Sequence, residues 1–75
     1  MITMESKQFF LNENDDYITL QQLLKACDII ASGGQVKQWL AENEVFVNGE
    51  PENRRGKKLR KGDVVEAANK RIELV

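Results

Sequence analysis

Apolar residues recur along this chain with two different periods, and the changes between them mark the expected helices and strands. One set follows the spacing of a single helical face: Leu20, Leu23, Leu24, Cys27 and Ile30. This spacing predicts an amphipathic helix. Thr19 and Gln22 form a Thr-x-x-Gln capping box, which places the start of the helix at Thr19.

A second helix is expected to begin at Ser32, where Gln35 completes another capping box. Its apolar face consists of Val36, Trp39 and Leu40. It should end near Glu42 or Asn43. Because a turn of only about one to three residues would separate the two helices, the pattern predicts a helical hairpin.

Four short apolar or alternating runs predict strands: residues 7–11, 45–47, 64–65 and 71–75. Asn48-Gly49 follows the second run and predicts a tight hairpin turn, because both residues tolerate a positive φ. The last run could pair with residues 8–11. The expected fold is α+β, with the helical hairpin packed on a small, mostly antiparallel sheet.

Length and composition point to one ordinary globular domain. The chain has 75 residues, of which 41% are hydrophobic and 31% are charged. We expect a single domain over residues 1–75, with a core motif at about 18–66 and terminal strands at about 7–12 and 71–75. No apolar run approaches the roughly 20 residues of a membrane span, and residues 1–10 lack a signal-peptide pattern. These features predict a cytoplasmic protein that does not contact a membrane, and we expect it to be a monomer.

No set of catalytic residues is visible in the sequence. The sequence has no histidine and a single cysteine, Cys27, which lies among apolar residues and is expected to be a buried small side chain. A zinc site and a Cys-His or Ser-His pair are therefore excluded. We expect no enzyme activity, no cofactor and no metal.

Charge is distributed unevenly along the chain. Residues 1–53 carry three lysines against nine acidic residues, a net charge of −6, whereas residues 54–75 carry eight cations against three acidic residues, a net charge of +5. The overall charge of −1 hides this asymmetry. Phosphate binding depends on the local potential, so a basic segment can bind nucleic acid in a chain of nearly neutral charge.

Two segments are candidates for contact with phosphate. The first is the basic loop after the Asn48-Gly49 turn, with Arg54, Arg55, Lys57, Lys58, Arg60 and Lys61. Its arginines can grip phosphate at two points, and Leu59 would hold the loop to the core. The second is the predicted helix start, with Ser32, Gly33, Gly34, Lys37 and Gln38. A helix start presents free N–H groups that suit phosphate.

Each candidate also has a simpler structural explanation. The basic loop would be a solvated charged face, and the glycines would belong to a well-capped helix without a ligand. Trp39 could stack on a base, although its spacing from Val36 and Leu40 favours a place in the core.

The order of these motifs resembles a known family. Ser32 to Lys37 at a helix start, Glu44 to Glu50 at a hairpin and Gly62 to Val65 after a basic loop are similar to the ribosomal protein S-four type RNA-binding domain, also called the αL motif. The Arg54-Arg55-Gly56-Lys57-Lys58-Leu59 segment resembles its small stand-alone bacterial branch most. Broader members usually have an arginine at the position of Gly33, so the expected contact shifts towards the loop.

The resemblance implies a module that binds structured RNA, often ribosomal RNA or tRNA, in ribosome assembly or translation. It assigns the contact to Ser32, Gly33, Gly34, Lys37, Arg54, Arg55, Lys57 and Lys58. The expected host is the ribosome or a pre-ribosomal particle. Two alternatives remain from the residues alone: a protein-interaction module that docks a basic partner on the acidic half, and an accessory subunit of an RNA-processing complex.

Overall fold

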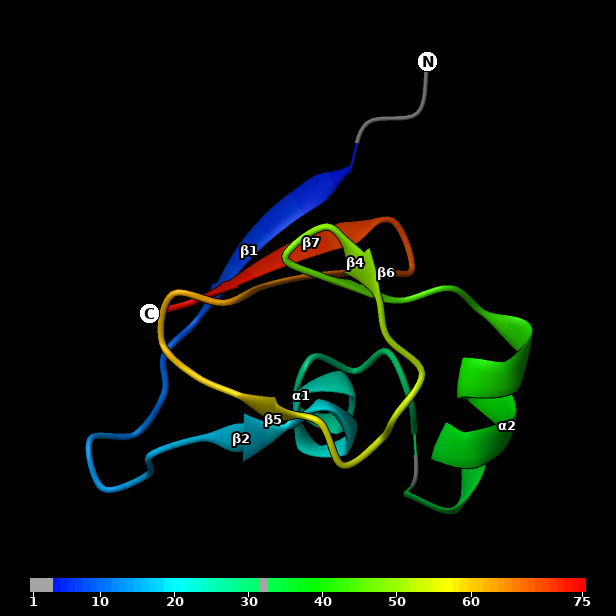
Figure 1. Ribbon diagram of the computed structural model, residues 1–75, viewed down its shortest axis with the longest axis horizontal. Coiled ribbons are helices and arrows are strands. Elements are labelled where there is room, and N and C mark those ends of the chain that lie inside the picture. The colour runs from blue at the N-terminus through cyan, green and yellow to red at the C-terminus, as the bar shows by residue number, and fades with distance from the viewer. Residues whose placement is uncertain (1–3, 32) are drawn as a thin grey trace.

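The structure is a computed structural model that describes residues 4–31 and 33–75, and it has two layers (Figure 1). One layer is a sheet with the strand order β1 (Glu5–Phe9), β7 (Lys70–Leu74), β6 (Val64–Ala67), β3 (Phe46–Val47) and β4 (Glu50–Pro51). The other contains α1 (Leu20–Ala26), α2 (Val36–Glu42) and a ribbon of β2 (Ile18–Thr19) and β5 (Lys58–Leu59). A 3-10 turn, η1 (Gly33–Gln35), leads into α2. The fold is α+β, as the sequence predicts.

The sheet is mostly antiparallel. Strand β6 pairs with β3 and β7 in antiparallel register, whereas β1 and β7 pair in parallel, with Gln8 opposite Glu73 and Phe9 opposite Leu74. The expected pairing between the two terminal segments is therefore confirmed. Strand β1 begins and ends two residues earlier than the predicted run at 7–11, but the Leu11 N–H still donates to the Val75 carbonyl at 2.9 Å.

Two hairpins of the sheet use turns with a left-handed backbone. In the β3–β4 hairpin, Asn48 has a φ of 53° and Gly49 a φ of 83°, which confirms the predicted turn. The β6–β7 hairpin has the same backbone form at Ala68 and Asn69, with φ values of 51° and 61°. Alanine does not favour this conformation, whereas asparagine tolerates it, so Asn69 carries the local signal for the second turn.

Helix α1 begins where its capping box predicts. The Gln22 N–H donates to Thr19 Oγ1 at 3.2 Å, and the Thr19 N–H donates to Gln22 Oε1 at 3.0 Å. The helix ends at Ala26, and Asp28 then has a φ of 58°. Ile30 is buried although it lies beyond the helix. The connection to η1 is therefore longer than the predicted turn of one to three residues, and that prediction was wrong. The physical reason is that Ile29 and Ile30 leave the helical path to pack on the core.

Helix α2 begins at Val36, not at Ser32, because a 3-10 turn precedes it. Gln35 occupies the N-cap position and makes no side-chain capping bond there. Ser32, which was expected to cap this helix, lies outside the described residues. The helix ends at Glu42, as predicted. The close packing of α1 and α2 as a helical hairpin stays a prediction.

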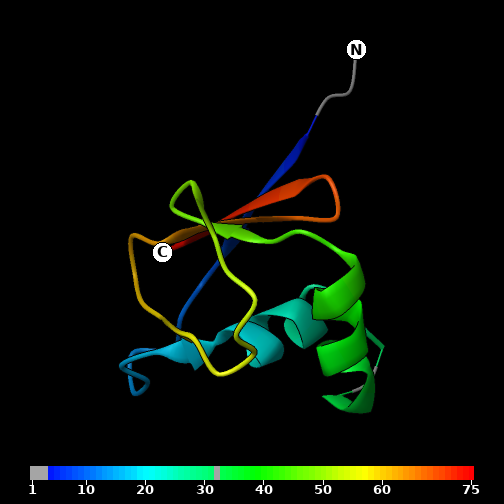
Figure 2. The ribbon, with the colours of Figure 1, turned by 45° about the vertical axis from the view of Figure 1, so that its right-hand side comes forward.

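The hydrophobic core lies between the two layers (Figure 2). Its buried residues are Leu20, Leu23, Leu24, Ile30, Val36, Leu40, Val45, Val47, Leu59, Val65, Ala67, Ile72 and Leu74. Trp39 packs partly buried against this core, as its helical spacing favours, and Cys27, which was expected to be buried, is also only partly buried there. Burial raises the pKa of the Cys27 thiol. Within residues 4–31 and 33–75, the helices are too short and too polar to cross a bilayer.

Candidate nucleic-acid interface

The basic loop, residues 54–61, is anchored to the start of α1 by its backbone. The Lys57 carbonyl accepts from the Leu20 N–H and the Arg55 carbonyl accepts from the Gln21 N–H, both at 2.9 Å. Together with the Thr19 hydroxyl, these carbonyls occupy the N–H groups of the first helical turn. Protein groups therefore occupy the N–H groups at the start of α1, and these hydrogen bonds hold the loop in place through its backbone.

The β3–β4 turn fixes the far end of the loop. Asn48 Nδ2 donates to Asp63 Oδ1 at 3.1 Å, and Asn48 Oδ1 accepts from the Val64 N–H at 2.9 Å. Asp63 Oδ2 in turn accepts from the Arg60 N–H at 2.8 Å. Leu59 is fully buried in the core, as predicted from the sequence. The basic loop thus has fixed points at both ends and one in its middle.

Arg54 is engaged with a carboxylate of its own chain. Its Nε and Nη2 donate to the Glu52 side chain at 3.0 and 3.1 Å, and its backbone N–H donates to the same carboxylate at 3.2 Å. These hydrogen bonds hold the pKa of Glu52 below its ordinary value. Because the pair is close to neutral, Arg54 contributes less to the positive potential than its formal charge suggests.

Arg55 lies beside the second helix. Arg55 and Lys37 line one surface hollow together with Leu40, Ala41 and Asn53. Both cationic side chains are exposed to solvent. The structure therefore brings the basic loop and the first turn of α2 together, so that two cations from distant parts of the chain face one site.

The other two cations of this segment have different neighbours. Lys57 lines a hollow with Glu50, Glu52 and Asp63, where acidic side chains surround it. Lys58 lies against Tyr17 instead, and its Nζ is 5.0 Å from the centre of the Tyr17 ring. That distance is typical of a cation–π contact. The four cations of residues 54–58 thus form a spread band and not one dense cluster.

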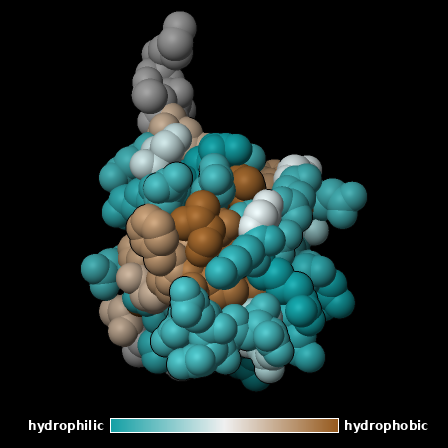
Figure 3. Space-filling view, turned by 90° about the vertical axis from the view of Figure 1, so that its left-hand side faces the viewer, coloured by the Kyte–Doolittle hydropathy of each residue, from teal (hydrophilic) through white to brown (hydrophobic). Residues whose placement is uncertain are grey.

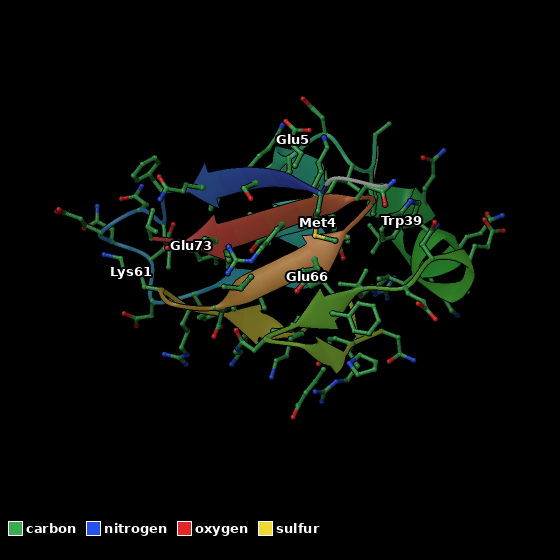
Figure 4. All side chains as sticks on the ribbon, turned by 90° about the horizontal axis from the view of Figure 1, so that it is seen from above. Met4, Glu5, Trp39, Lys61, Glu66 and Glu73 are labelled. Atoms are coloured by element: carbon green, nitrogen blue, oxygen red, sulfur yellow. The ribbon has the colours of Figure 1, made fainter. Side chains whose placement is uncertain are left out.

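Lys61 lies far from the second helix. Figure 4, which looks down on the sheet, shows Lys61 at one end of the molecule and Trp39 of α2 at the other. Arg60 precedes it in the turn that Asp63 stabilises, and both cations are exposed. The structure therefore places Lys61 at the opposite end of the molecule from α2, which carries Lys37.

The glycine-rich entry to α2 is open at Gly34. A Cβ atom at this position would meet nothing within 4 Å, and Gly34 is not among the glycines with a positive φ. The Gln38 amide, one turn into the helix, donates to Glu42 at 3.2 Å. Gln38 is thus engaged within the helix, while Gly34 leaves the backbone accessible.

Comparison with known proteins places this arrangement in a family. Residues 11–75 match the family model described as the S4 domain. The chain belongs to the S4 domain family. It is also similar to a probable ribosome maturation protein, RlbA, of Bacillus subtilis (strain 168), with 61% identity over 51 residues, which cover 68% of this chain and 72% of that protein.

Some residues of this S4 domain surface were not predicted from the sequence. Asn53 lines the hollow with Lys37 and Arg55, Glu52 binds Arg54, and Tyr17 faces Lys58. The Glu52-x-Arg54 spacing could have suggested the ion pair, whereas the Tyr17 contact joins residues that are distant in sequence. In the part of the chain that the structure describes, no three acidic or cysteine side chains gather as a metal site would require.

Proposed function

We propose that this S4 domain binds structured RNA and that it acts in ribosome maturation. The observation that carries the proposal is the shared hollow of Lys37 and Arg55, where the start of α2 meets the basic loop. Two exposed cations on separate, fixed elements can contact successive phosphates without rearranging. The similarity to the Bacillus protein, which is named as a probable ribosome maturation protein, supports the same role.

The RNA would be ribosomal RNA or tRNA, recognised mainly by its shape. An A-form helix hides its base edges in a deep, narrow major groove, so proteins contact its phosphates and hydroxyl groups. The α1–α2 unit and the basic loop would form one surface, with phosphates at Gly34 and Lys37 and along residues 54–58. The ribosome or a pre-ribosomal particle in the cytoplasm would be the host, and the chain would bind it as a monomer.

The proposed role is binding without catalysis. The chain has no histidine to serve as a base near neutral pH. Its cationic surface consists of groups that bind phosphate through charge and hydrogen bonds. The domain would therefore act on the folding or assembly of an RNA particle through its affinity for one RNA conformation.

Substitution of the basic loop tests this proposal. Replacing Arg54, Arg55, Lys57 and Lys58 with alanine should weaken binding to ribosomal RNA strongly, because binding releases counterions from several phosphates. Thermal stability should change only modestly, since Arg54, Arg55 and Lys58 are exposed and Lys57 is half-buried, and exposed substitutions usually cost less than about 0.5 kcal/mol each. Filter binding at several salt concentrations and a thermal melt would measure the two effects.

A matched variant controls for total charge. Lys7, Lys25, Lys70 and Arg71 lie outside the candidate surface, and their replacement with alanine removes the same formal charge. This control should lose much less RNA affinity than the loop variant. Equal losses of RNA affinity in the two variants would mean that only net charge matters. An unchanged RNA affinity in the folded loop variant would contradict RNA binding at this surface. It would favour a protein-interaction module or an accessory subunit.

A further inference from the structure

A second surface hollow lies at the other end of the molecule from α2. Phe9, Phe10, Leu11, Tyr17, Ile18 and Ala26 supply its apolar lining. Phe10 is 75% exposed and Tyr17 is 40% exposed, so both aromatic rings are open to solvent. Figure 3 shows an apolar patch on this end of the molecule, surrounded by hydrophilic surface. Exposed apolar patches with a polar rim mark interaction sites.

The polar part of the lining is acidic. Asp15 and Asp16 line the hollow together with Asn12, Asn14, Thr19 and Gln22, and among the described residues no lysine or arginine lines it. A local turn holds the acidic segment, since the Asp15 N–H donates to the Asn12 carbonyl at 2.9 Å and the Asn14 N–H donates to Asn12 Oδ1 at 3.3 Å. The hollow therefore combines exposed aromatic rings with negative charge.

We propose that this hollow binds a basic polypeptide segment that carries an apolar anchor side chain. The carboxylates of Asp15 and Asp16 would attract lysine or arginine residues of the partner. The exposed ring of Phe10 would contact the anchor, whereas the Tyr17 ring beside it already has the Lys58 ammonium of the same chain over it. This hollow borders the proposed RNA surface at Lys58 and is separate from the hollow that Lys37 and Arg55 line.

Other occupants fit the hollow less well. RNA phosphates would be repelled by the two carboxylates, so stacking of a base on Phe10 would come with an electrostatic cost. A second copy of this chain could offer its basic loop, but the apolar residue in that loop, Leu59, is fully buried and cannot serve as the anchor. Charge complementarity therefore favours a different, basic protein.

A peptide probe tests the proposal on the whole chain. The probe is a short fluorescent peptide in which lysine and arginine alternate with leucine, and its affinity is measured by fluorescence anisotropy. Replacement of Phe10 with serine should weaken binding by about tenfold, which corresponds to about 1.4 kcal/mol. Replacement of both Asp15 and Asp16 with lysine should weaken it at least as much and should reduce its dependence on salt.

Two controls separate this site from general attraction between charges. Replacement of Glu44 and Glu50 with lysine makes the same charge change at exposed positions outside the hollow and should leave most of the affinity. A peptide with serine in place of leucine should bind more weakly than the leucine peptide. Nuclear magnetic resonance of labelled protein should show peptide-induced shifts at residues 9–18.

Three results would overturn the proposal. Equal losses in the Asp15/Asp16 and Glu44/Glu50 variants would mean that the peptide senses only overall charge. A loss of RNA affinity in the Phe10→Ser variant, with no change in peptide binding, would make the patch part of the RNA surface. Concentration-dependent self-association that the Phe10→Ser variant abolishes would make it a contact between copies of this chain.

Discussion

Arg54 and Arg55 are neighbours with the same charge and different surroundings. The Arg54 guanidinium forms two hydrogen bonds with Glu52, whose side chain is only 11% exposed, whereas Arg55 shares a hollow with Lys37. A guanidinium that already binds a carboxylate must break those hydrogen bonds before it can bind phosphate in the same geometry. At the scale of single residues, the two arginines should therefore differ in their contribution to RNA binding.

We expect Arg55→Ala to lower RNA affinity by about tenfold, or about 1.4 kcal/mol, and Arg54→Ala to lower it less. Glu52→Gln should raise the affinity, because it removes a negative charge beside the loop and frees the Arg54 guanidinium. Titration of one RNA with the three variants at a single salt concentration measures the order of their RNA affinities. A larger loss for Arg54→Ala than for Arg55→Ala would show that Arg54 leaves Glu52 to contact the RNA.

The same ion pair predicts a pH dependence of stability. Hydrogen bonds from Arg54 lower the pKa of Glu52 from its ordinary value of 4.5. A carboxyl group whose pKa is lower in the folded state than in the unfolded chain stabilises the protein at pH values above the unfolded pKa. This contribution is lost as the pH falls through the folded pKa. Glu52→Gln should therefore lose less stability than the parent chain on acidification below about pH 5.

Urea unfolding at a series of pH values would measure this difference. Arg54→Ala serves as the partner variant, because it removes the hydrogen bonds that lower the Glu52 pKa and should also flatten the acid side of the profile. If both variants follow the parent curve, the pair does not contribute to stability in solution, as is common for exposed ion pairs.

At the scale of elements, the turn that leads into α2 is the part of the surface where one substitution should affect stability and RNA binding in opposite directions. Gly34 lies in the 3-10 turn that precedes the helix, and a side chain there would meet open space. A carboxylate near a helix start interacts favourably with the helix dipole. The same carboxylate would repel a phosphate bound beside Lys37.

We therefore expect Gly34→Glu to keep or slightly raise the melting temperature and to lower RNA affinity. Gly34→Gln is the matched control, because it has nearly the same shape without the charge, and it should bind RNA better than Gly34→Glu. Thermal melts and RNA titrations of both variants separate the two effects. Equal RNA affinity for Gly34→Glu and the parent chain would limit the interface to the basic loop.

At the scale of the whole molecule, the cations are spread along its longest dimension, which is 33 Å. Lys61 and α2 lie towards opposite ends of this axis in Figure 4. We expect that a short RNA stem bound at Lys37 and Arg55 does not reach Lys61. The effects of substitutions at Lys37 and at Lys61 on RNA binding should therefore depend differently on the length of the RNA.

On a short RNA stem, Lys37→Ala should reduce the slope of log affinity against log salt by about one unit, because one phosphate contact is lost. Lys61→Ala should leave that slope almost unchanged on the short stem and reduce it on a longer RNA. Salt titrations with the two RNAs measure both slopes. An equal effect of the two substitutions on the short stem would place Lys61 within the primary contact surface.

The sequence alone determined the features that depend on neighbouring residues. The capping box at Thr19, the turn at Asn48-Gly49 and the burial of Leu59 follow from local spacing and backbone preferences, and the structure confirms each of them. The α+β class follows from the same local patterns. The candidate surface was predicted in outline, because charge runs and a family resemblance identify residues without stating what they contact.

The tertiary structure alone decided which of these charges face a common site. It brings Lys37 and Arg55 to one hollow, pairs Arg54 with Glu52 and places Lys61 at the opposite end of the molecule from α2. It also permits the left-handed turn at Ala68-Asn69, which strands β6 and β7 impose against the preference of alanine. These outcomes depend on packing between residues that are distant in the chain, and the free energy of that packing exceeds the local preferences that a sequence pattern records.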